Sequence, residues 1–368
     1  MKITRVVLHH LRMPLVSPFE TSFGSIASRD SILLEIHGDG LVGYGECVAD
    51  RDPGYSYETS GTAWHILRDF LIPAILNHEL HQADELQERL SNVRGHPMAK
   101  AGLEMAFWDM LGKYQGRSLK ALLGGVFDQV EVGVSVGIQD SSQKLLAVVE
   151  NYLKRGYRRV KIKIKPGRDI EETRAVRRAY PQLRLQVDAN SAYTLSSAST
   201  LKPLDGLSLL LIEQPLPEDD LWDHSRMQQQ FNTPICLDES ILSTRHARQA
   251  LEMEACRVIN IKAGRVGGLS QAVSIHDLCR SKAIPVWCGG MLETGVGRAS
   301  NLALASLPGF TLPGDISASD RYYREDITDE RFTLNRDSTI DVPNGPGLGV
   351  GINRKAVTRY TVQRLAIP

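Results

Sequence analysis

Several features that mark other classes of protein are missing from this sequence of 368 residues. Its 43 basic and 43 acidic residues give a formal net charge of zero, so it lacks the positive excess with which proteins bind nucleic acid or anionic membranes. No apolar run approaches the roughly 20 residues that a membrane span needs. The first residues also lack the basic-then-apolar pattern of a signal peptide, and we therefore expect a cytoplasmic protein.

Cysteine is sparse as well. The five cysteines are scattered, odd in number and form no CxxC pair, a pattern that favours free buried thiols in a reducing compartment. Apolar residues make up 42% of the chain and charged residues 23%, which is ordinary for a soluble globular protein. The length allows two domains, one of which could be a barrel of roughly 200 to 250 residues.

A repeat of about 25 residues runs through the middle of the chain. Short, β-rich apolar runs end at Lys163, Asp188, Glu213, Asp238 and Lys262, with successive spacings of 25, 25, 25 and 24 residues. One strand, one helix and two loops fill such a repeat, which predicts βαβ units and a parallel sheet. In α/β barrels the carboxyl ends of the strands form one face, and that face carries the active site.

The repeat predicts an α/β barrel over residues 126–339, with eight strands and seven intervening helices but no ordinary eighth helix. The last of its strands is expected at residues 310–313. Residues 1–125 read as strands followed by helices, which predicts a small α+β domain. A tail from about residue 340 to 368 is expected to return to this domain and complete it.

Within the first domain, strands are predicted over residues 2–12, 31–37 and 41–47, the last two joined by a hairpin turn. The segment of residues 18–28 is rich in small and polar residues, and residues 48–57 contain a Pro-Gly-Tyr turn. Either segment could be an ordinary connection or a mobile flap over a binding site.

Three of the repeated residues, Asp188, Glu213 and Asp238, form an all-oxygen set on neighbouring strands. Converging carboxylates repel one another unless a cation lies between them. Oxygen ligands without His or Cys suit Mg²⁺ or Mn²⁺ rather than Zn²⁺. The alternative is that each acid pairs with a basic residue inside the barrel, which equal spacing of all three makes the weaker interpretation.

The two repeated lysines, Lys163 and Lys262, lie on either side of the acidic strands and so on opposite sides of a carboxylate substrate held by the metal. Lys161 shares the face of Lys163 because side chains alternate along a strand. Its charge would lower the pKa of Lys163 towards neutrality and could bind the substrate carboxylate. We predict removal of a proton next to that carboxylate, with Lys163 as base and Lys262 as acid or as the cation that stabilises an enediolate.

These residues resemble a known pattern, that of the enolase superfamily in its muconate-lactonising subgroup. The pattern is Lys161-x-Lys163, Asp188-x-Asn190, Glu213-Gln-Pro215, Asp238-Glu239-Ser240 and Lys262. Within the subgroup the chain is most similar to o-succinylbenzoate synthases that double as N-acylamino acid (N-succinylamino acid) racemases. The stretches that carry this similarity are residues 19–24, 99–125, 132–138, 161–167, 187–195, 287–293 and 297–298.

The resemblance implies an α+β capping domain over a (β/α)7β TIM-type barrel, with Mg²⁺ or Mn²⁺ held by Asp188, Glu213 and Asp238. It implies that Asn190 and Glu239 support these ligands. It also implies a small-molecule carboxylate as substrate and a homo-oligomer, either a dimer or an octamer. Family positions that contact the succinyl or acyl group fall on Ser135, Gly290, Met291, Phe23 and Tyr55.

The implied reaction is the syn-dehydration of 2-succinyl-6-hydroxy-2,4-cyclohexadiene-1-carboxylate to 2-succinylbenzoate, a step of menaquinone biosynthesis. Lys163 would take the α-proton and return it to the leaving hydroxide. In the racemisation of N-succinylamino acids, Lys163 and Lys262 would serve opposite faces of the α-carbon. The residues alone do not separate a synthase from a dedicated racemase, because one site supports both.

Residues at single positions argue against some of the other reactions known on this scaffold. A mandelate-racemase-type enzyme would need a catalytic His at the seventh strand, where Trp287 and Cys288 stand, and dipeptide epimerases usually carry Asp-x-Asp where this chain has Asp315 and Ser317. A muconate-type cycloisomerase shares the lysines and stays open. A class I aldolase would leave the three carboxylates unexplained, and a non-catalytic binding protein would not depend on Lys163 for turnover.

Overall fold

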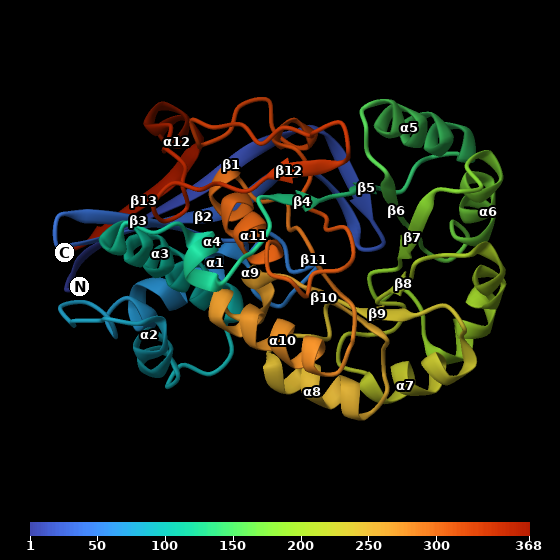
Figure 1. Cartoon of the computed structure of the whole chain (residues 1–368), viewed down its shortest axis with the longest axis horizontal. Coiled ribbons are helices and arrows are strands. Elements are labelled where there is room, and N and C mark those ends of the chain that lie inside the picture. Colours follow the sequence, from blue (N-terminus) through green and yellow to red (C-terminus); the bar gives the residue numbers. More distant parts are fainter.

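The computed structural model describes residues 1–368 and contains two large sheets, each with its own helices (Figure 1). One is a four-stranded antiparallel sheet, and the other is a curled sheet of seven parallel strands with helices around its outside. A short two-stranded ribbon forms a third sheet. This mixed α/β architecture with a curled parallel sheet confirms the predicted fold class.

The antiparallel sheet has the strand order β13-β1-β2-β3. Its strands are β1 (Ile3–Thr21), β2 (Gly24–Gly38), β3 (Leu41–Cys47) and β13 (Thr361–Ile367). Its two faces serve two cores. Val6 and Ile36, which lie opposite each other, belong to the smaller core with the N-terminal helices, whereas Leu33 and Met13 face the larger core that continues into the parallel sheet.

The helices that follow cover one face of this sheet. They are α1 (Ser60–Ile66), the short π-helix η1 (Leu67–Leu71), α2 (Ala83–Leu90) and α3 (Pro97–Gln115). Helix α3 crosses β3 at very short range because glycines line the contact. A Cβ added to Gly45 would lie 2.1 Å from the Gly102 carbonyl oxygen, and one added to Gly43 would lie 2.1 Å from the Ala106 oxygen. Only a missing side chain allows this approach.

The segment of residues 18–28, expected as a connection or flap, is instead the tip of a β-hairpin. Strands β1 and β2 stay paired almost to the turn, with Phe19 opposite Ile26 and Thr21 opposite Gly24. The register shifts between Pro14 and Phe19, and this irregularity accommodates the prolines within a strand. The first and second strands are therefore much longer than their apolar runs predict.

The parallel sheet has the order β11-β10-β9-β8-β7-β6-β5. Its strands are β5 (Val134–Val136), β6 (Arg159–Lys163), β7 (Arg184–Asp188), β8 (Ile212–Glu213), β9 (Ile235–Leu237), β10 (Val258–Ile261) and β11 (Val286–Cys288). The helices between and after them are α5 (Ser142–Lys154), α6 (Ile170–Ala179), η2 (Leu195–Leu207), α7 (Leu221–Gln230), α8 (Thr244–Glu252), α9 (Ala263–Val266), α10 (Leu269–Ser281) and α11 (Gly295–Ala305). Chain order equals strand order, as successive βαβ units require.

The eighth strand predicted at residues 310–313 is reduced to isolated contacts. Phe310 bridges to Val286 in β11, and Gly314 bridges to Val132 next to β5, so this segment closes the ring between the first and last strands. Gly133 donates to the Gly314 carbonyl over 2.8 Å. A proline at position 313 cannot donate to a ladder, which keeps the closure from becoming a regular strand.

The end of the chain contacts both parts of the molecule. Strand β12 (Thr339–Asp341) pairs with β4 (Gln129–Glu131) at the start of the barrel, whereas β13 follows α12 (Arg354–Tyr360) and pairs with β1. The remaining short helices are α4 (Leu119–Leu123) and η3 (Ser319–Arg321). The division into a capping domain of residues 1–125 and a barrel of residues 126–339 stays a prediction.

The interior of the barrel is filled below its carboxyl end. Leu211, Cys236, Val258 and Trp287 form a small buried cluster there, and the Trp287 indole N–H lies 3.3 Å from the Cys236 sulfur. All five cysteines are free and buried, which confirms the prediction of free buried thiols. No helix is both long and apolar enough to cross a membrane.

Candidate active site

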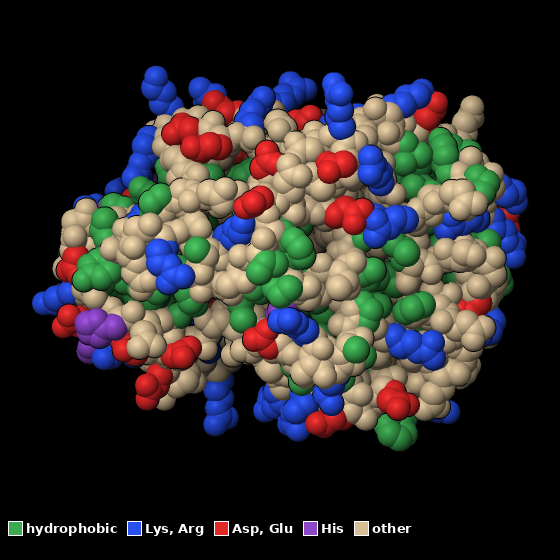
Figure 2. All heavy atoms as spheres, in the orientation of Figure 1, with side chains coloured by type: hydrophobic (Ala, Val, Ile, Leu, Met, Phe, Trp, Pro, Cys, Tyr) green, Lys and Arg blue, Asp and Glu red, His purple; other side chains and the backbone are tan.

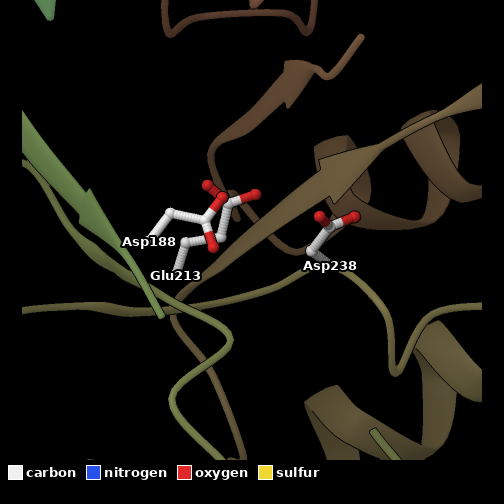
Figure 3. Close-up of side chains that lie close together, drawn as sticks. All are labelled: Asp188, Glu213 and Asp238. Carbon is white, nitrogen blue, oxygen red and sulfur yellow. The ribbon is translucent and has the colours of Figure 1, made fainter. Parts of the chain in front are cut away.

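Three carboxylates meet at the carboxyl ends of neighbouring strands (Figure 3). Asp188 ends β7, Glu213 ends β8, and Asp238 directly follows β9. One oxygen from each lies within 4.8 Å of the others, and all three residues are fully buried. The structure thus brings together the three acids predicted as metal ligands, and a buried set of oxygen donors alone fits a hard divalent cation.

Lys161 lies among these acids and carries a charge that they stabilise. Its Nζ is 2.8 Å from Glu213 Oε2, 3.0 Å from Asp188 Oδ2 and 2.7 Å from Asp315 Oδ2. Burial alone lowers the pKa of Lys161, but the charges of Asp315, Glu213 and Asp188 outweigh it and hold the pKa well above its usual value. Lys161 is therefore a fixed positive charge at the floor of the site.

Lys163 points to a different set of partners. Its Nζ lies 2.7 Å from Asp188 Oδ2 and 2.6 Å from Asn190 Oδ1. The Asn190 amide in turn donates to Glu239 Oε1 over 2.7 Å. Asn190 adopts a left-handed backbone with φ of 43°, which asparagine tolerates better than most residues. Asn190 and Glu239, predicted to support the acids, form a chain behind the predicted base.

Lys262 follows β10 and lies on the far side of the acids. The strand order places β7, β8 and β9 between β6, which carries Lys163, and β10. Lys262 Nζ is 2.7 Å from Asp238 Oδ2 and 3.0 Å from the Tyr55 hydroxyl. Arg265 contacts the other oxygen of Asp238, so this carboxylate lies between two cations. The two predicted acid–base lysines thus flank the triad.

The crowded charges and the burial of the site shift the pKa values of two neighbouring acids in opposite directions. Burial, together with the charge of Asp188, raises the pKa of Glu213 to about 7. Burial also favours the neutral form of Asp188, but Lys163 and Lys161 outweigh it and hold the pKa of Asp188 far below its usual range. A divalent cation between the carboxylates would favour the ionised form of both.

A cavity of about 200 Å³ lies over the lysines. Lys161, Lys163, Lys262 and Asn190 line its floor, and the three acids lie beneath them. All five side chains or positions expected to contact the acyl group line it too: Phe23, Tyr55, Ser135, Gly290 and Met291. The cavity is therefore built from strand ends of the barrel, the hairpin tip and the loop after β3.

The two candidate flaps meet above this cavity. A Cβ on Gly54 would lie 2.7 Å from the ring of Phe23, so the loop after β3 packs closely against the hairpin tip. Ser22 Oγ donates to the Asn190 carbonyl over 3.1 Å, which joins the hairpin to the barrel. Figure 2 shows the surface in the orientation of Figure 1, where charged side chains of both signs are interspersed.

Two residues of the site, Asn260 and Asp315, were not predicted from the sequence to belong to it. Asn260 donates to Glu213 Oε1 over 2.8 Å, and its position two residues before Lys262 repeats the spacing of Lys161 and Lys163. That spacing was a usable signal. Asp315, weighed only as half of an epimerase motif, binds Lys161 and lies 2.6 Å from Arg159 Nη1. Its partners come from a strand more than 150 residues earlier, which no local pattern reveals.

Comparison with known proteins gives matches over both parts of the chain. Residues 2–124 match the family described as "Mandelate racemase / muconate lactonizing enzyme, N-terminal domain", and residues 144–356 match "Enolase C-terminal domain-like". The o-succinylbenzoate synthase of Geobacillus stearothermophilus is 51% identical over 98% of this chain and 96% of its own length. The N-succinylamino acid racemase of Thermus thermophilus is 49% identical over 98% of each chain.

Solved structures agree with these matches. A member of the enolase superfamily from Listeria innocua superposes with a TM-score of 0.96 at 42% identity, over 100% of this chain and 99% of that one. The N-succinyl Arg/Lys racemase of Bacillus cereus superposes with a TM-score of 0.92 at 27% identity, over 100% of both chains. Similarity of sequence and of fold therefore extends over the whole molecule.

Proposed function

This chain belongs to the enolase superfamily, and on that premise we propose that it is an o-succinylbenzoate synthase that also racemises N-succinylamino acids. One observation carries the proposal. Two lysines lie on opposite sides of three buried carboxylates, under a cavity of the size of a small acid. Relatives about half identical over nearly their whole length bear one or other of the two names.

The acids would hold Mg²⁺ or Mn²⁺, which when bound offsets the charge of a substrate carboxylate and of the enediolate that grows from it. In the synthase reaction, neutral Lys163 takes the proton from the carbon next to this carboxylate as the C–H bond breaks. The C–O bond then breaks on the same face, and the ammonium of Lys163 returns the proton to the departing hydroxide, which leaves as water.

Two further lysines deal with the charge that this step creates. Lys161, already held as a cation between Asp315 and the triad, is placed to attract the substrate carboxylate. The Lys262 ammonium, on the other side, stabilises the enediolate during dehydration. In racemisation Lys262 has a second task, because it gives or takes the α-proton on the face opposite Lys163.

The walls of the cavity suit a succinyl chain. Phe23 and Met291 supply apolar surface, and Ser135 supplies a buried hydroxyl whose oxygen has no hydrogen-bond partner within the protein. A buried unpaired hydroxyl is costly, so a polar group of the ligand would be a favourable partner for it. We therefore assign the acyl oxygen or the distal carboxylate to the neighbourhood of Ser135.

The substrate of such an enzyme is a small dicarboxylate of menaquinone biosynthesis, and we place the reaction in the cytoplasm, where five free thiols would stay reduced. A dedicated N-succinylamino acid racemase is the second candidate, favoured by the relatives that carry this name alone. Both candidates need the same five side chains, so the test must measure both reactions.

The test uses the purified full-length protein with Mg²⁺ or Mn²⁺ in two assays. One follows dehydration to 2-succinylbenzoate, and the other follows exchange of the α-proton of N-succinylamino acids in D₂O. Lys163→Ala should abolish dehydration and the exchange that occurs on its face. The matched control is Lys154→Ala, which removes an exposed lysine of α5. Dehydration by Lys163→Ala at the wild-type rate would contradict the assignment of the base.

A further inference from the structure

The loop after β3 brings one side chain into the floor of the barrel. The Tyr55 hydroxyl lies 3.0 Å from Asp238 Oδ1 and 3.0 Å from Lys262 Nζ. The same ammonium lies 4.5 Å from the centre of the Tyr55 ring. Tyr55 was expected to contact the acyl group of the substrate. Its polar contacts are instead with a predicted metal ligand and a predicted acid–base lysine, 183 and 207 residues further along the chain.

The direction of these hydrogen bonds follows from the chemistry of the partners. An ammonium can only donate and an ionised carboxylate can only accept, whereas a tyrosine hydroxyl donates one hydrogen bond and accepts others. The hydroxyl therefore donates to Asp238 and accepts from Lys262. Arg265 Nη1, 3.3 Å away, donates to the same oxygen. With its proton committed to Asp238, Tyr55 turns a lone pair towards Lys262 and fixes one N–H direction of the ammonium.

The other predicted acid–base lysine, Lys163, has no hydrogen-bond partner from the N-terminal part of the chain. The hydrogen-bond partners of Lys163 are Asp188 and Asn190, both at the end of barrel strand β7. Lys262 shares its orientation between the barrel residue Asp238 and a loop that belongs to the N-terminal part of the chain. The two lysines are thus held in different ways, one by the barrel and the other by barrel and loop together.

We propose that Tyr55 is a positioning residue for Lys262, and that the seating of its loop sets the efficiency of proton transfer on one face of the site only. The inference rests on the proposed function, because it needs a reaction in which both faces of the α-carbon are used. Without the hydroxyl, the ammonium keeps its charge and its contact with the ring but loses one of the two acceptors that direct it, and only Asp238 is left. Small displacements of a reacting group cost up to about 100-fold in rate.

The test measures exchange of the α-proton of D- and L-N-succinylphenylalanine in D₂O, separately, by proton NMR with Mg²⁺ present. Tyr55→Phe keeps the ring and its packing and removes only the hydroxyl. Exchange should fall about 10- to 100-fold with one enantiomer and stay within about threefold with the other. The affected enantiomer should be the one whose exchange Lys262→Ala abolishes, whereas Lys163→Ala should abolish exchange of the other.

The matched control is Tyr193→Phe, which removes a hydroxyl that donates to Asp169 Oδ2 over 2.7 Å outside the cavity. The ratio of the two exchange rates should stay at the wild-type value in this variant. An equal loss with both enantiomers in Tyr55→Phe, a rise of KM with both enantiomers at unchanged kcat, or no loss at all would overturn the inference and leave the proposed function standing. A wild-type protein that exchanges neither enantiomer would overturn the racemase part of the proposed function and this inference with it.

Discussion

The hydrogen bond between Asn260 and Glu213 offers a sharp test of how the acidic triad holds a cation. The Asn260 amide donates to Glu213 Oε1 over 2.8 Å, and both residues are fully buried. Asn260→Ala leaves that oxygen without this donor, and a lost hydrogen bond to a charged group is worth roughly 1.5–3 kcal/mol. Because the bond favours the ionised form, its loss should raise the pKa of Glu213 further above its usual value.

A protonated carboxyl is a poor ligand, so the same loss should appear in metal affinity. We expect Asn260→Ala to weaken Mg²⁺ binding about 10- to 100-fold at pH 7, which is the range typical of residues that orient metal ligands. Isothermal titration calorimetry on the protein without substrate measures this directly. Activity is not needed for the measurement, so the result does not depend on which reaction the enzyme catalyses.

The control is a second buried Asn–Glu pair outside the triad. Asn301 donates to Glu293 Oε1 over 2.9 Å, and Asn301→Ala should leave Mg²⁺ affinity within about threefold of the wild type, because neither residue belongs to the acidic set. Circular dichroism would show that both variants are folded. Unchanged Mg²⁺ affinity in a folded Asn260→Ala variant would refute the idea that Asn260 holds Glu213 ready for the cation.

Three other features of the structure give outcomes that can be measured. Asp315→Ala leaves Arg159 without its buried carboxylate partner and should lower the free energy of unfolding by about 3–5 kcal/mol in urea titrations. Gly45→Ala places a methyl group 2.1 Å from the Gly102 oxygen, so it should cost several kcal/mol or prevent folding, as expression and thermal melting would show. With the pKa of Glu213 at about 7, protons and Mg²⁺ compete below that pH, and calorimetry should find affinity falling about tenfold per pH unit.

The first two of these outcomes have matched control variants. Asp320→Ala removes an exposed partner of Arg155 and should change stability little, because exposed ion pairs contribute little. Gly61→Ala adds a methyl group whose nearest neighbour is 3.7 Å away and should leave the protein stable. A pH-independent Mg²⁺ affinity between pH 5 and 8 would contradict the raised pKa of Glu213.

The lysines and acids at the centre of the site could be predicted from the sequence because strand geometry is periodic. A repeat of 25 residues puts one strand end after another at the same face, and alternation along β6 places Lys161 and Lys163 together. Asn260 follows the same alternation and could have been predicted, because it lies two residues before Lys262 in the sequence. The contacts of Asp315 with Lys161 and of Tyr55 with Lys262 could not be predicted, although Tyr55 itself was expected in the site, because the partners lie 154 and 207 residues away and only the whole fold brings them near.

The fold itself was predictable where apolar patterns matched secondary structure and not where prolines interrupted them. Pro14 and Pro18 made the first hairpin look shorter than it is, since a proline inside a strand normally argues against it. The irregular register between Pro14 and Phe19 removes that objection. The prediction of an eighth strand had the opposite fault. The apolar run at residues 310–313 looks like a strand, but this segment pairs only through isolated bridges.

The origin of each wall explains why one site would serve two reactions. The proton-transferring and acidic side chains all come from the ends of β6 to β10, and both reactions need them in the same places. What differs between the substrates is the part beyond the α-carbon, which under the proposed function would face two residues that line the cavity, Phe23 on the hairpin tip and Met291 on the barrel rim. A preference for one substrate can therefore arise at the walls without disturbing the lysines, except at Tyr55. That residue belongs to a wall segment and also holds Lys262, so changes in its loop should alter racemisation and dehydration by different factors, since only racemisation needs proton transfer from Lys262.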